Sequence, residues 1–289
     1  MKHFANSIKL CYNRFDGQRG NVNVFLRKDV KKNMGRIITI ANQKGGVGKT
    51  TTAINLSACL AEAGQHVMLV DFDPQGNASS GLGVEKEDYE HTVYDMMAEE
   101  ADLDECLVKN IQDNLDVLPS DMNLAGAEIE FQEVEDKETL LKRYLDKVRD
   151  DYDFILIDCP PSLNILTINA LTAADTVLVP IQCEYYALEG LNQVLKTVEL
   201  VKRKLNPQLE LEGVVFTMYD ARTNLSLQVV ESVKNNLNQT IYKTIIPRNV
   251  RLAEAPSHGM SINLYDTRST GAESYRMLAA EVMSRGEEL

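Results

Sequence analysis

The sequence ANQKGGVGKTTT (residues 41–52) lies between a short apolar run, residues 36–41, and a segment with helical spacing, residues 50–63. The run RIITIA is rich in β-branched residues, which is typical of a buried strand, and the segment after the loop contains no Gly or Pro. The glycines therefore join a strand to a helix. In that context they let backbone N–H groups surround phosphate oxygens, and the helix N-terminus adds a partial positive charge. The stretch predicts a loop that binds nucleotide phosphates.

The residue types in this loop suit a nucleotide bound with Mg²⁺. Lys49 is placed to reach the β and γ phosphates, and Thr50 has the hydroxyl that a nucleotide-bound Mg²⁺ requires. The alternative is a glycine-rich turn with accidental lysines, and the order of strand, loop and helix argues against it. The predicted nucleotide-binding residues of the loop are Lys44, Gly45, Gly46, Val47, Gly48, Lys49, Thr50 and Thr51.

Lys44 is a second lysine in a loop that needs only one. Lys49 already fills the phosphate position, and a second buried ammonium beside it would be costly unless anions surround it. If two subunits face each other across two nucleotides, Lys44 of each can reach the phosphates held by the other. A solvated loop lysine is the alternative. The first interpretation predicts a homodimer that forms on ATP binding.

Together with motifs further along the chain, the loop resembles the deviant Walker A ATPases, KGGxGK[ST], which include the ParA partition ATPases, MinD and the nitrogenase iron protein. The resemblance covers nearly the whole chain from Met34 onward and is strongest to the short chromosomal ParA type called Soj. In that family the extra lysine reaches across a nucleotide-sandwich dimer. The motifs that carry the resemblance are NQKGGVGKTTT, VDFDPQGNASSGLG, ILIDCPPSLNILTINAL, QCEYYALEGL, MYDARTN and PRNVRLAEAPSHG.

Composition narrows the class of protein. The 289 residues, 44% of them hydrophobic, are enough for one α/β domain with a substantial core. No apolar run approaches the roughly 18 residues of a membrane span, and the N-terminus lacks a signal-peptide core, so we expect a cytoplasmic protein. The cysteines include no C-x-x-C pair, and an odd number fits reduced thiols better than a disulfide framework. The paired cysteine motifs through which the nitrogenase iron protein binds its cluster have no match here, which disfavours that branch. The five cysteines are Cys11, Cys59, Cys106, Cys159 and Cys183.

The first 33 residues differ in charge from the rest of the chain. They hold eight basic and two acidic side chains, a net of +6, so the whole-chain charge of −13 leaves −19 for residues 34–289. One interpretation is a basic arm that binds nucleic acid. The other is an upstream extension created by choosing too early a start codon. The absence of helical periodicity in the segment favours the second interpretation. We expect the ATPase domain to comprise residues 34–289.

The alternation of apolar runs and helical patterns is typical of βαβ units. It predicts a single-domain α/β fold of the P-loop NTPase class, with a doubly wound, mostly parallel sheet and helices on both faces. The acidic stretch 85–136 is the most irregular and is predicted to lie outside the central sheet as a variable cap. Strands are expected at 36–41, 66–72, 115–118, 154–159, 176–181, 211–218 and 241–246, and helices near 50–63, 92–99, 123–130, 137–149, 164–174, 188–205, 225–237 and 272–284.

Three carboxylates end predicted strands. Asp71 and Asp73 have the spacing that places side chains on one side of an extended segment, and Asp158 ends an apolar run in the form of a Walker B motif. The resemblance implies that Asp73 orients the attacking water; the alternative is that it only caps the turn before Pro74. Asp71 would support Mg²⁺ through water or position the loop, and Asp158 would hold a Mg²⁺-bound water. The predicted catalytic residues are Lys44, Lys49 and Asp73, and the predicted metal residues are Thr50, Asp71 and Asp158.

No dedicated strong base is evident, so hydrolysis would depend on positioning and charge neutralisation and should be slow. For the adenine ring, IPRNV (residues 246–250) resembles the base-side loop of the family, and Pro247 and Asn249 are the predicted contacts. A plain strand-to-loop turn is the alternative.

Arg222 and Arg251 match positions that Soj-like proteins use for sequence-independent binding of double-stranded DNA, and both are expected in loops at strand ends. Such phosphate contacts give an affinity that falls with salt. Two ordinary solvated arginines are the alternative. Because the charge of residues 34–289 repels DNA, only a local patch assembled by dimerisation could bind it.

The resemblance implies a nucleoid-associated function in chromosome partition. An ATP-bound dimer would bind DNA, and a ParB-like partner would stimulate hydrolysis and release; an influence on the replication initiator DnaA is also implied. Alternatives are a nucleotide switch without required hydrolysis and a MinD-like membrane-associated division-site ATPase. MinD uses a basic amphipathic C-terminal helix, whereas residues 270–289 have two basic side chains against five acidic groups, counting the terminal carboxylate. We therefore expect no membrane contact and predict that the apolar face packs on the domain: Tyr275, Leu278, Ala279 and Val282.

Overall fold

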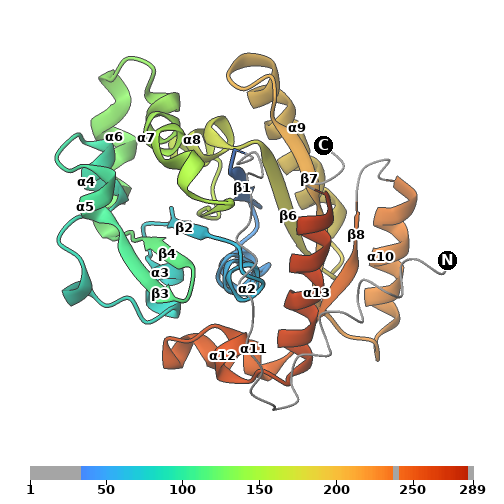
Figure 1. Cartoon of the computed structure of the whole chain (residues 1–289). Helices are drawn as coiled ribbons and strands as arrows, with labels where there is room; N and C mark the ends of the chain where they lie inside the picture. The colour runs from blue at the N-terminus through green and yellow to red at the C-terminus, as the bar shows by residue number, and fades with distance from the viewer. Residues whose placement is uncertain (1–33, 237–240, 286–289) are drawn as a thin grey trace, which may run out of the picture. The chain divides into compact units, whose positions relative to one another are not determined.

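The centre of the protein is a twisted sheet with strand order β3-β4-β2-β5-β1-β6-β7-β8 (Figure 1). The computed structural model describes residues 34–236 and 241–285, so the basic segment 1–33 lies outside the described residues. Neighbouring strands run parallel, except for the antiparallel edge pair β3 and β4. The strands are β1 Arg36–Ile40, β2 Val67–Asp71, β3 Val108–Gln112, β4 Leu115–Leu118, β5 Phe154–Asp158, β6 Thr176–Gln182, β7 Glu210–Tyr219 and β8 Ile241–Pro247.

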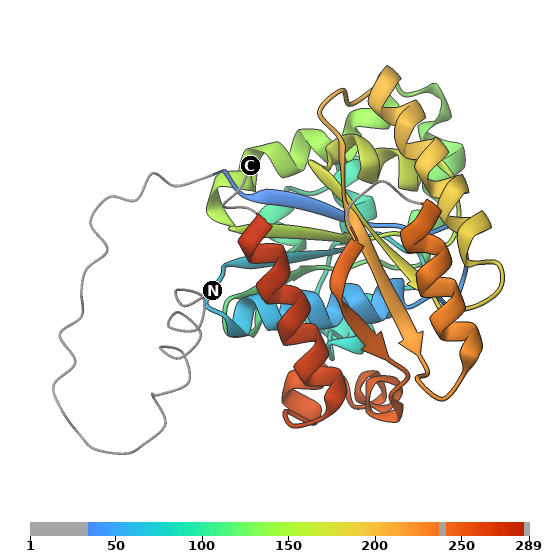
Figure 2. The ribbon, with the colours of Figure 1, turned by 90° about the vertical axis from the view of Figure 1, so that its right-hand side faces the viewer.

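Helices cover both faces of this sheet (Figures 1 and 2). One layer contains α2 (Lys49–Glu62), α3 (Asn77–Gly81), α11 (Val250–Glu254), α12 (Ile262–Tyr265) and α13 (Thr270–Arg285). The opposite layer contains α4 (Val93–Met97), α5 (Leu103–Cys106), α6 (Ala127–Glu130), α7 (Leu140–Val148), α8 (Ile165–Ala173), α9 (Ala187–Lys204) and α10 (Asn224–Asn236). This arrangement confirms the doubly wound α/β fold.

The two layers follow from the apolar composition of the central strands. Successive side chains of a strand point to opposite faces. Ile37 of β1 and Ile155 of β5 therefore pack into one core cluster, while Ile38 and Leu156 pack into the other. A strand that is apolar at every position must be covered on both sides, which is why such runs occur in parallel sheets between helices.

The carboxyl ends of the central strands meet at one edge of the sheet. The neighbours β1 and β6 connect in opposite directions: β1 leads through α2 to β2 on one side, and β6 leads through α9 to β7 on the other. Ligands of open α/β sheets bind at such a switch point. In register, Asp158 of β5 lies beside Ile40 of β1 and also beside Asp71 of β2. The fold thereby brings the glycine-rich loop and two of the predicted acidic residues together.

The prediction that residues 85–136 lie outside the sheet is wrong. This stretch supplies β3, which was not expected, and β4, and its short helix α4 buries Val93, Met96 and Met97 in the core. A capping box between Thr92 and Asp95 starts that helix. The helix expected at 92–99 and the strand expected at 115–118 are present as α4 and β4, but no local pattern showed that β4 would pair with β2 and carry β3 on its other side.

The C-terminal helix α13 packs on α2 and β8. Its predicted apolar face is buried as expected, since Tyr275, Leu278, Ala279 and Val282 all belong to the core. Within residues 34–236 and 241–285, no helix is long and apolar enough to cross a membrane.

A buried ion pair joins the sheet to α13 at the opposite edge from the loop. Arg36 donates hydrogen bonds to the Val282 carbonyl (2.8 Å) and to Glu212 Oε2 (2.7 Å). The Tyr242 hydroxyl donates to the other oxygen of Glu212 at 2.8 Å, and the Arg285 guanidinium lies over the Tyr242 ring. Glu212 thus connects the start of β1 with β7, β8 and α13.

Replacing Glu212 with Ala should lower the free energy of unfolding by about 3 kcal/mol, because the change leaves the Arg36 charge and the Tyr242 hydroxyl buried without their acceptor. Urea denaturation of nucleotide-free protein measures the loss. The matched control is Asp146→Ala, which breaks an exposed pair with Lys142 and should cost less than about 0.5 kcal/mol. Equal losses in the two variants would contradict a structural role for Glu212.

Candidate nucleotide-binding site

The glycine-rich loop is held between β6 and β7 by two side chains. The Asn42 amide donates to the Pro180 carbonyl (2.8 Å) and accepts from the Lys44 backbone N–H (3.0 Å). On the other side, the Thr217 hydroxyl donates to the Val47 carbonyl at 2.7 Å. The sequence analysis assigned no role to Asn42 or Thr217, because nothing local in the sequence shows which strands will lie beside the loop.

Gly48 is the N-cap of α2 and has φ of 88°, in the left-handed region that favours glycine. Its conformation turns the chain from the loop into the helix. Helix α2 begins at Lys49, one residue before the predicted start, and its N-terminus faces the loop cavity. Backbone N–H groups at such a helix start have no intrahelical partner and are available to an anion.

A cavity of about 360 Å³ opens at this helix start. Lys49 is only 6% exposed and donates to the Lys44 carbonyl at 3.2 Å. Burial lowers the pKa of the Lys49 ammonium, and the charges of Asp158 and Asp73 oppose this effect. A buried cation surrounded in this way favours an anionic ligand. The residues that line the cavity are Gly45, Gly46, Gly48, Lys49, Thr50, Thr51, Asp73, Gln75, Asn77, Pro161 and Met218.

Asp71 is fully buried and its carboxylate is occupied by the loop that follows. Its Oδ2 accepts from the Ser79 backbone N–H and from the Ser79 hydroxyl, both at 2.8 Å, and its Oδ1 accepts from the Asp73 N–H at 3.3 Å. Burial raises the pKa of Asp71 to about 6 despite these bonds. The structure thus places Asp71 where it positions the loop, and it does not line the phosphate cavity.

Asp73 lines the cavity and also closes a turn. Its Oδ1 accepts from the Gln75 N–H at 3.0 Å, which is the cap geometry that the sequence analysis left as an alternative. The same side chain borders the space beside Lys49 and Thr50. The cap fixes one oxygen of Asp73, and a fixed carboxylate at the cavity wall is suited to orient a water molecule.

Asp158 is fully buried, and neither of its carboxylate oxygens has a hydrogen-bond partner among the described residues. Burial and then the charge of Asp71 raise the pKa of Asp158 well above its ordinary value, although the nearby Thr50 hydroxyl and the Lys49 charge oppose the shift. A buried carboxylate without partners is unfavourable, so the site fits a hard cation or its bound water, which prefers oxygen ligands.

The fit to Mg²⁺ requires the nucleotide. Among the described residues, no group of three or more His, Cys, Asp or Glu side chains could hold an ion. Thr50 and Asp158 can supply a hydroxyl and a carboxylate on adjacent elements, and phosphate oxygens would have to complete the coordination.

Lys44 points away from the phosphate cavity of its own chain. It forms an ion pair with Glu184 in the loop after β6, and its Nζ lies 5.9 Å from the centre of the Tyr186 ring. The neighbouring Tyr185 is 80% exposed and packs edge-on against Tyr186. The motif QCEYYALEGL was noted for its resemblance, but no local pattern identified Glu184 or Tyr186 as neighbours of Lys44.

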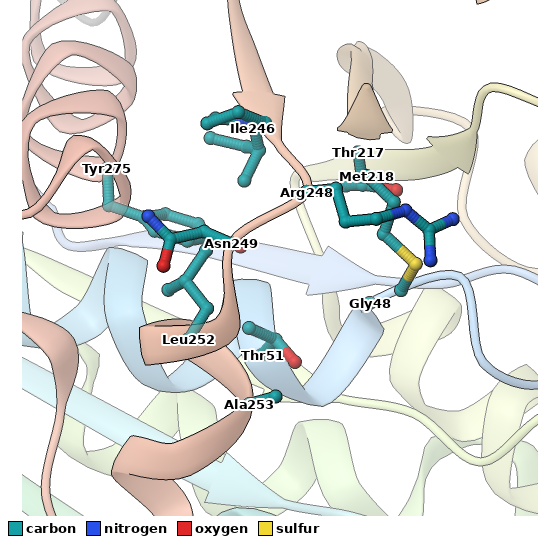
Figure 3. A pocket seen from close by; sticks show the side chains of 11 residues that line it. Gly48, Thr51, Thr217, Met218, Ile246, Arg248, Asn249, Leu252, Ala253 and Tyr275 are labelled. Carbon is teal, nitrogen blue, oxygen red and sulfur yellow. The ribbon is translucent and has the colours of Figure 1, made fainter. Parts of the chain in front are cut away.

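A second cavity, of about 200 Å³, lies beside the first and shares Gly48, Thr51 and Met218 with it (Figure 3). Its walls are mainly apolar, with side chains from Ile246 and Tyr275, as suits a base. The lining residues are Gly48, Thr51, Thr217, Met218, Ile246, Pro247, Arg248, Asn249, Leu252, Ala253 and Tyr275.

Pro247 and Asn249, the predicted contacts of the adenine ring, both line this second cavity. The Asn249 amide, however, is engaged at both ends: Nδ2 donates to the Thr270 hydroxyl and Oδ1 accepts from the Arg251 N–H, each at 2.8 Å. A bound base would therefore meet backbone groups here rather than a free amide.

Met218 borders both cavities, and its backbone has φ of 50°, a strained conformation for a residue other than glycine. In Figure 3 its side chain lies close to Gly48. The sequence analysis missed Met218, since backbone strain leaves no pattern in an unbranched apolar residue.

The two predicted DNA-binding arginines lie at the ends of adjacent strands. Arg222 follows β7 and is exposed, as predicted. Arg251 was expected in a loop, but it lies in the first turn of the short helix α11, because Asn249 caps that helix. Arg222 pairs with Asp220, and Arg251 pairs with Glu254 and Asp266.

Comparison with known proteins agrees with this geometry. A family model described as an AAA domain matches residues 35–211. The sporulation initiation inhibitor protein Soj of Bacillus subtilis is 60% identical over 88% of this chain and 100% of its own length. The chromosome partitioning protein ParA of Myxococcus xanthus is 49% identical over 98% of this chain and 96% of its own.

Two solved structures are also similar. Cobyrinic acid a,c-diamide synthase from Mycobacterium smegmatis, with bound ADP and magnesium, is 37% identical with a TM-score of 0.78 over 88% of this chain and 96% of that chain. The cell division ATPase MinD of Pyrococcus furiosus is 29% identical with a TM-score of 0.72 over 87% and 100% of the two chains.

The fold and the loop define a P-loop nucleotide-binding protein. The chain belongs to the Soj/ParA family of chromosome-partitioning ATPases. Its activity is ATP hydrolysis, and its cofactors are ATP and Mg²⁺.

Asp158→Asn should make the nucleotide-free protein more stable at neutral pH, because burial raises the pKa of the Asp158 carboxyl and folding therefore opposes its ionisation, whereas Asn does not ionise. Below about pH 3 the carboxyl is protonated in both folded and unfolded chains, and its ionisation no longer affects stability. As the pH rises further, the carboxyl ionises in the unfolded chain but not in the folded chain, where its pKa is raised. The unaltered protein therefore loses stability relative to the variant. The stabilisation by Asn should therefore grow from about pH 4.5 to about pH 7.5, to at least about 1 kcal/mol.

Urea unfolding in EDTA at the two pH values measures this difference, with the exposed Asp146→Asn as control. Thermal unfolding with Mg²⁺ and ATP supplies the second measurement. The variant should lack most of the stabilisation that Mg²⁺ with ATP gives the unaltered protein. A variant that is less stable than the unaltered protein at the higher pH would contradict an unpaired Asp158.

Proposed function

We propose that the chain is an ATP-dependent DNA-binding switch of chromosome segregation, located on the nucleoid. ATP closes a homodimer, the dimer binds double-stranded DNA without sequence preference, and hydrolysis stimulated by a ParB-like partner releases it. The observation that carries the proposal is that the two lysines of the loop occupy different places. Lys49 fills the phosphate cavity of its own chain, whereas Lys44 lies outside it on the neighbouring loop.

The position of Lys44 supports a contact between two chains. Its side chain is 37% exposed and paired with Glu184, beside exposed Tyr185 and Tyr186. An exposed ion pair contributes little stability, so phosphate from a second nucleotide can replace Glu184 at low cost. Lys44 of each protomer would then neutralise charge on the phosphates held by the other.

Hydrolysis in this arrangement depends on positioning and electrostatics. Lys49 and the loop N–H groups bind the phosphates, Asp73 orients the attacking water, and Lys44 from the partner neutralises developing charge. Thr50 and Asp158 would hold Mg²⁺ together with the nucleotide, and the ion would supply further charge neutralisation. Without a strong general base the rate is low, which suits a timed release from DNA.

The acidic surface supports a basic protein partner. Around α6 the exposed acidic side chains Glu130, Glu133, Glu135 and Asp136 lie near exposed Val134. Such a surface attracts a basic segment and increases its association rate. The MinD-like alternative has less support here, because the apolar face of α13 is buried in the domain.

Lys44→Gln should retain ATP binding but lose ATP-induced dimerisation, with hydrolysis reduced by at least about tenfold. Fluorescent-nucleotide titration, light scattering and phosphate release measure the three properties. Lys49→Gln is the matched control and should lose nucleotide binding itself. If Lys44→Gln dimerises with ATP like the unaltered protein, Lys44 does not act across an interface.

The DNA-binding proposal is tested with random-sequence duplex DNA, ATP or ADP, and the Asp73→Ala variant that blocks hydrolysis. We expect binding with ATP only, with an affinity that falls as salt rises. Arg222→Glu in the same background should abolish it. Absence of DNA binding with every nucleotide would reject this function and favour a test with anionic liposomes.

A further inference from the structure

The loops after β7 and β8 bring three charged residues together at the carboxyl edge of the sheet. β7 and β8 are parallel neighbours, with Tyr219 in register with Pro247. The Arg248 N–H donates to the Tyr219 carbonyl at 3.0 Å, which places Arg248 beside the start of the loop that contains Asp220 and Arg222. Two strand ends thus supply one carboxylate and two guanidinium groups.

Asp220 holds Arg222 through three hydrogen bonds. The Arg222 guanidinium donates from Nε to Oδ1 (2.8 Å) and from Nη2 to Oδ2 (2.7 Å), and its backbone N–H donates to Oδ1 (3.0 Å). This is the two-pronged geometry in which an arginine would also bind a phosphate. The carboxylate therefore occupies the hydrogen-bonding groups that a phosphodiester would use.

Arg248 differs from the other two arginines at this edge. Arg222 and Arg251 are both paired with carboxylates, whereas the Arg248 guanidinium has no hydrogen bond or ion pair with any part of the chain that the structure describes. Its side chain is exposed and extends toward Met218 at the margin of the base cavity (Figure 3). The hydrogen bonds from Arg222, and to a smaller extent the charge of Arg248, lower the pKa of the Asp220 carboxyl.

We propose that Arg248 is a further ligand of DNA phosphate and that Asp220 restrains Arg222 until phosphate replaces it. The inference rests on the proposed DNA-binding function and names residues that set its strength. Arg248 binds a phosphate without first giving up a partner.

The strength of the restraint is modest, which makes it reversible. The Arg222 side chain is 86% exposed, and exposed ion pairs are weak and screened by salt. Phosphate at a DNA surface can therefore displace Asp220, while free protein keeps Arg222 away from stray anions. The effect should appear as a change in DNA affinity rather than as a loss of folding.

The test measures fluorescence anisotropy of a labelled random-sequence duplex with ATP, over a range of salt, in the Asp73→Ala background. Asp220→Asn should bind about three- to tenfold more tightly at low salt, since it removes the competing carboxylate from both protomers. Arg248→Gln should bind about tenfold more weakly. Its plot of log affinity against log salt should be shallower by about 0.9 for each phosphate that the arginine no longer neutralises.

Matched controls change the same charge elsewhere: Asp146→Asn on α7 and Arg203→Gln on α9, both exposed. Light scattering with ATP checks that every variant still dimerises. If Asp220→Asn binds like Asp146→Asn, the restraint is refuted; if Arg248→Gln binds like Arg203→Gln, the ligand role is refuted. In both cases DNA binding by the parent protein leaves the proposed function intact. Absence of binding by the parent rejects the function and this inference together.

Discussion

The attachment of the glycine-rich loop to β6 and β7 is the constraint on which the rest of the site depends. Asn42 fixes the start of the loop to the Pro180 carbonyl, and Thr217 fixes its middle through the Val47 carbonyl. Backbone N–H groups bind an anion well only if they already converge before it arrives. The loop after β6 contains Glu184, the partner of Lys44, and the loop after β7 contains Arg222. The same two strands therefore position the phosphate site, the proposed dimer contact and the proposed DNA contact.

Charge balance explains why the site needs its ligands. Asp158 is buried without a partner, Asp71 is satisfied only by Ser79 and a neighbouring N–H, and Lys49 is buried among these acids. Each isolated charge is unfavourable in a low-dielectric interior. A nucleotide with its cation supplies both the negative and the positive charge that these groups lack, and the protein keeps this arrangement because tertiary packing elsewhere offsets its cost.

Much of this could be predicted from short-range patterns. Strand and helix periodicity indicated the order of most elements, and the loop sequence indicated the phosphate site with Lys49 and Thr50 at its cavity. Errors came where local patterns are weak. Residues 85–136 were expected outside the sheet, because no local pattern shows that β4 pairs with β2, and Arg251 was expected in a loop although Asn249 caps a helix there. Pro247 and Asn249 line the second cavity, but the state of the Asn249 amide depends on Thr270, 21 residues away.

The sequence by itself determined the doubly wound fold, the glycine-rich turn and the residue types of the phosphate site, because these follow from periodicity and backbone freedom within a few residues. Tertiary structure alone decided which carboxylates stay unpaired, where Lys44 rests, and that Asp220, Arg222 and Arg248 share one edge. Those properties depend on burial and on contacts between strand ends far apart in the chain. The pKa and the energetic contribution of a charged side chain depend on its solvent exposure and its partner, and both are set by packing.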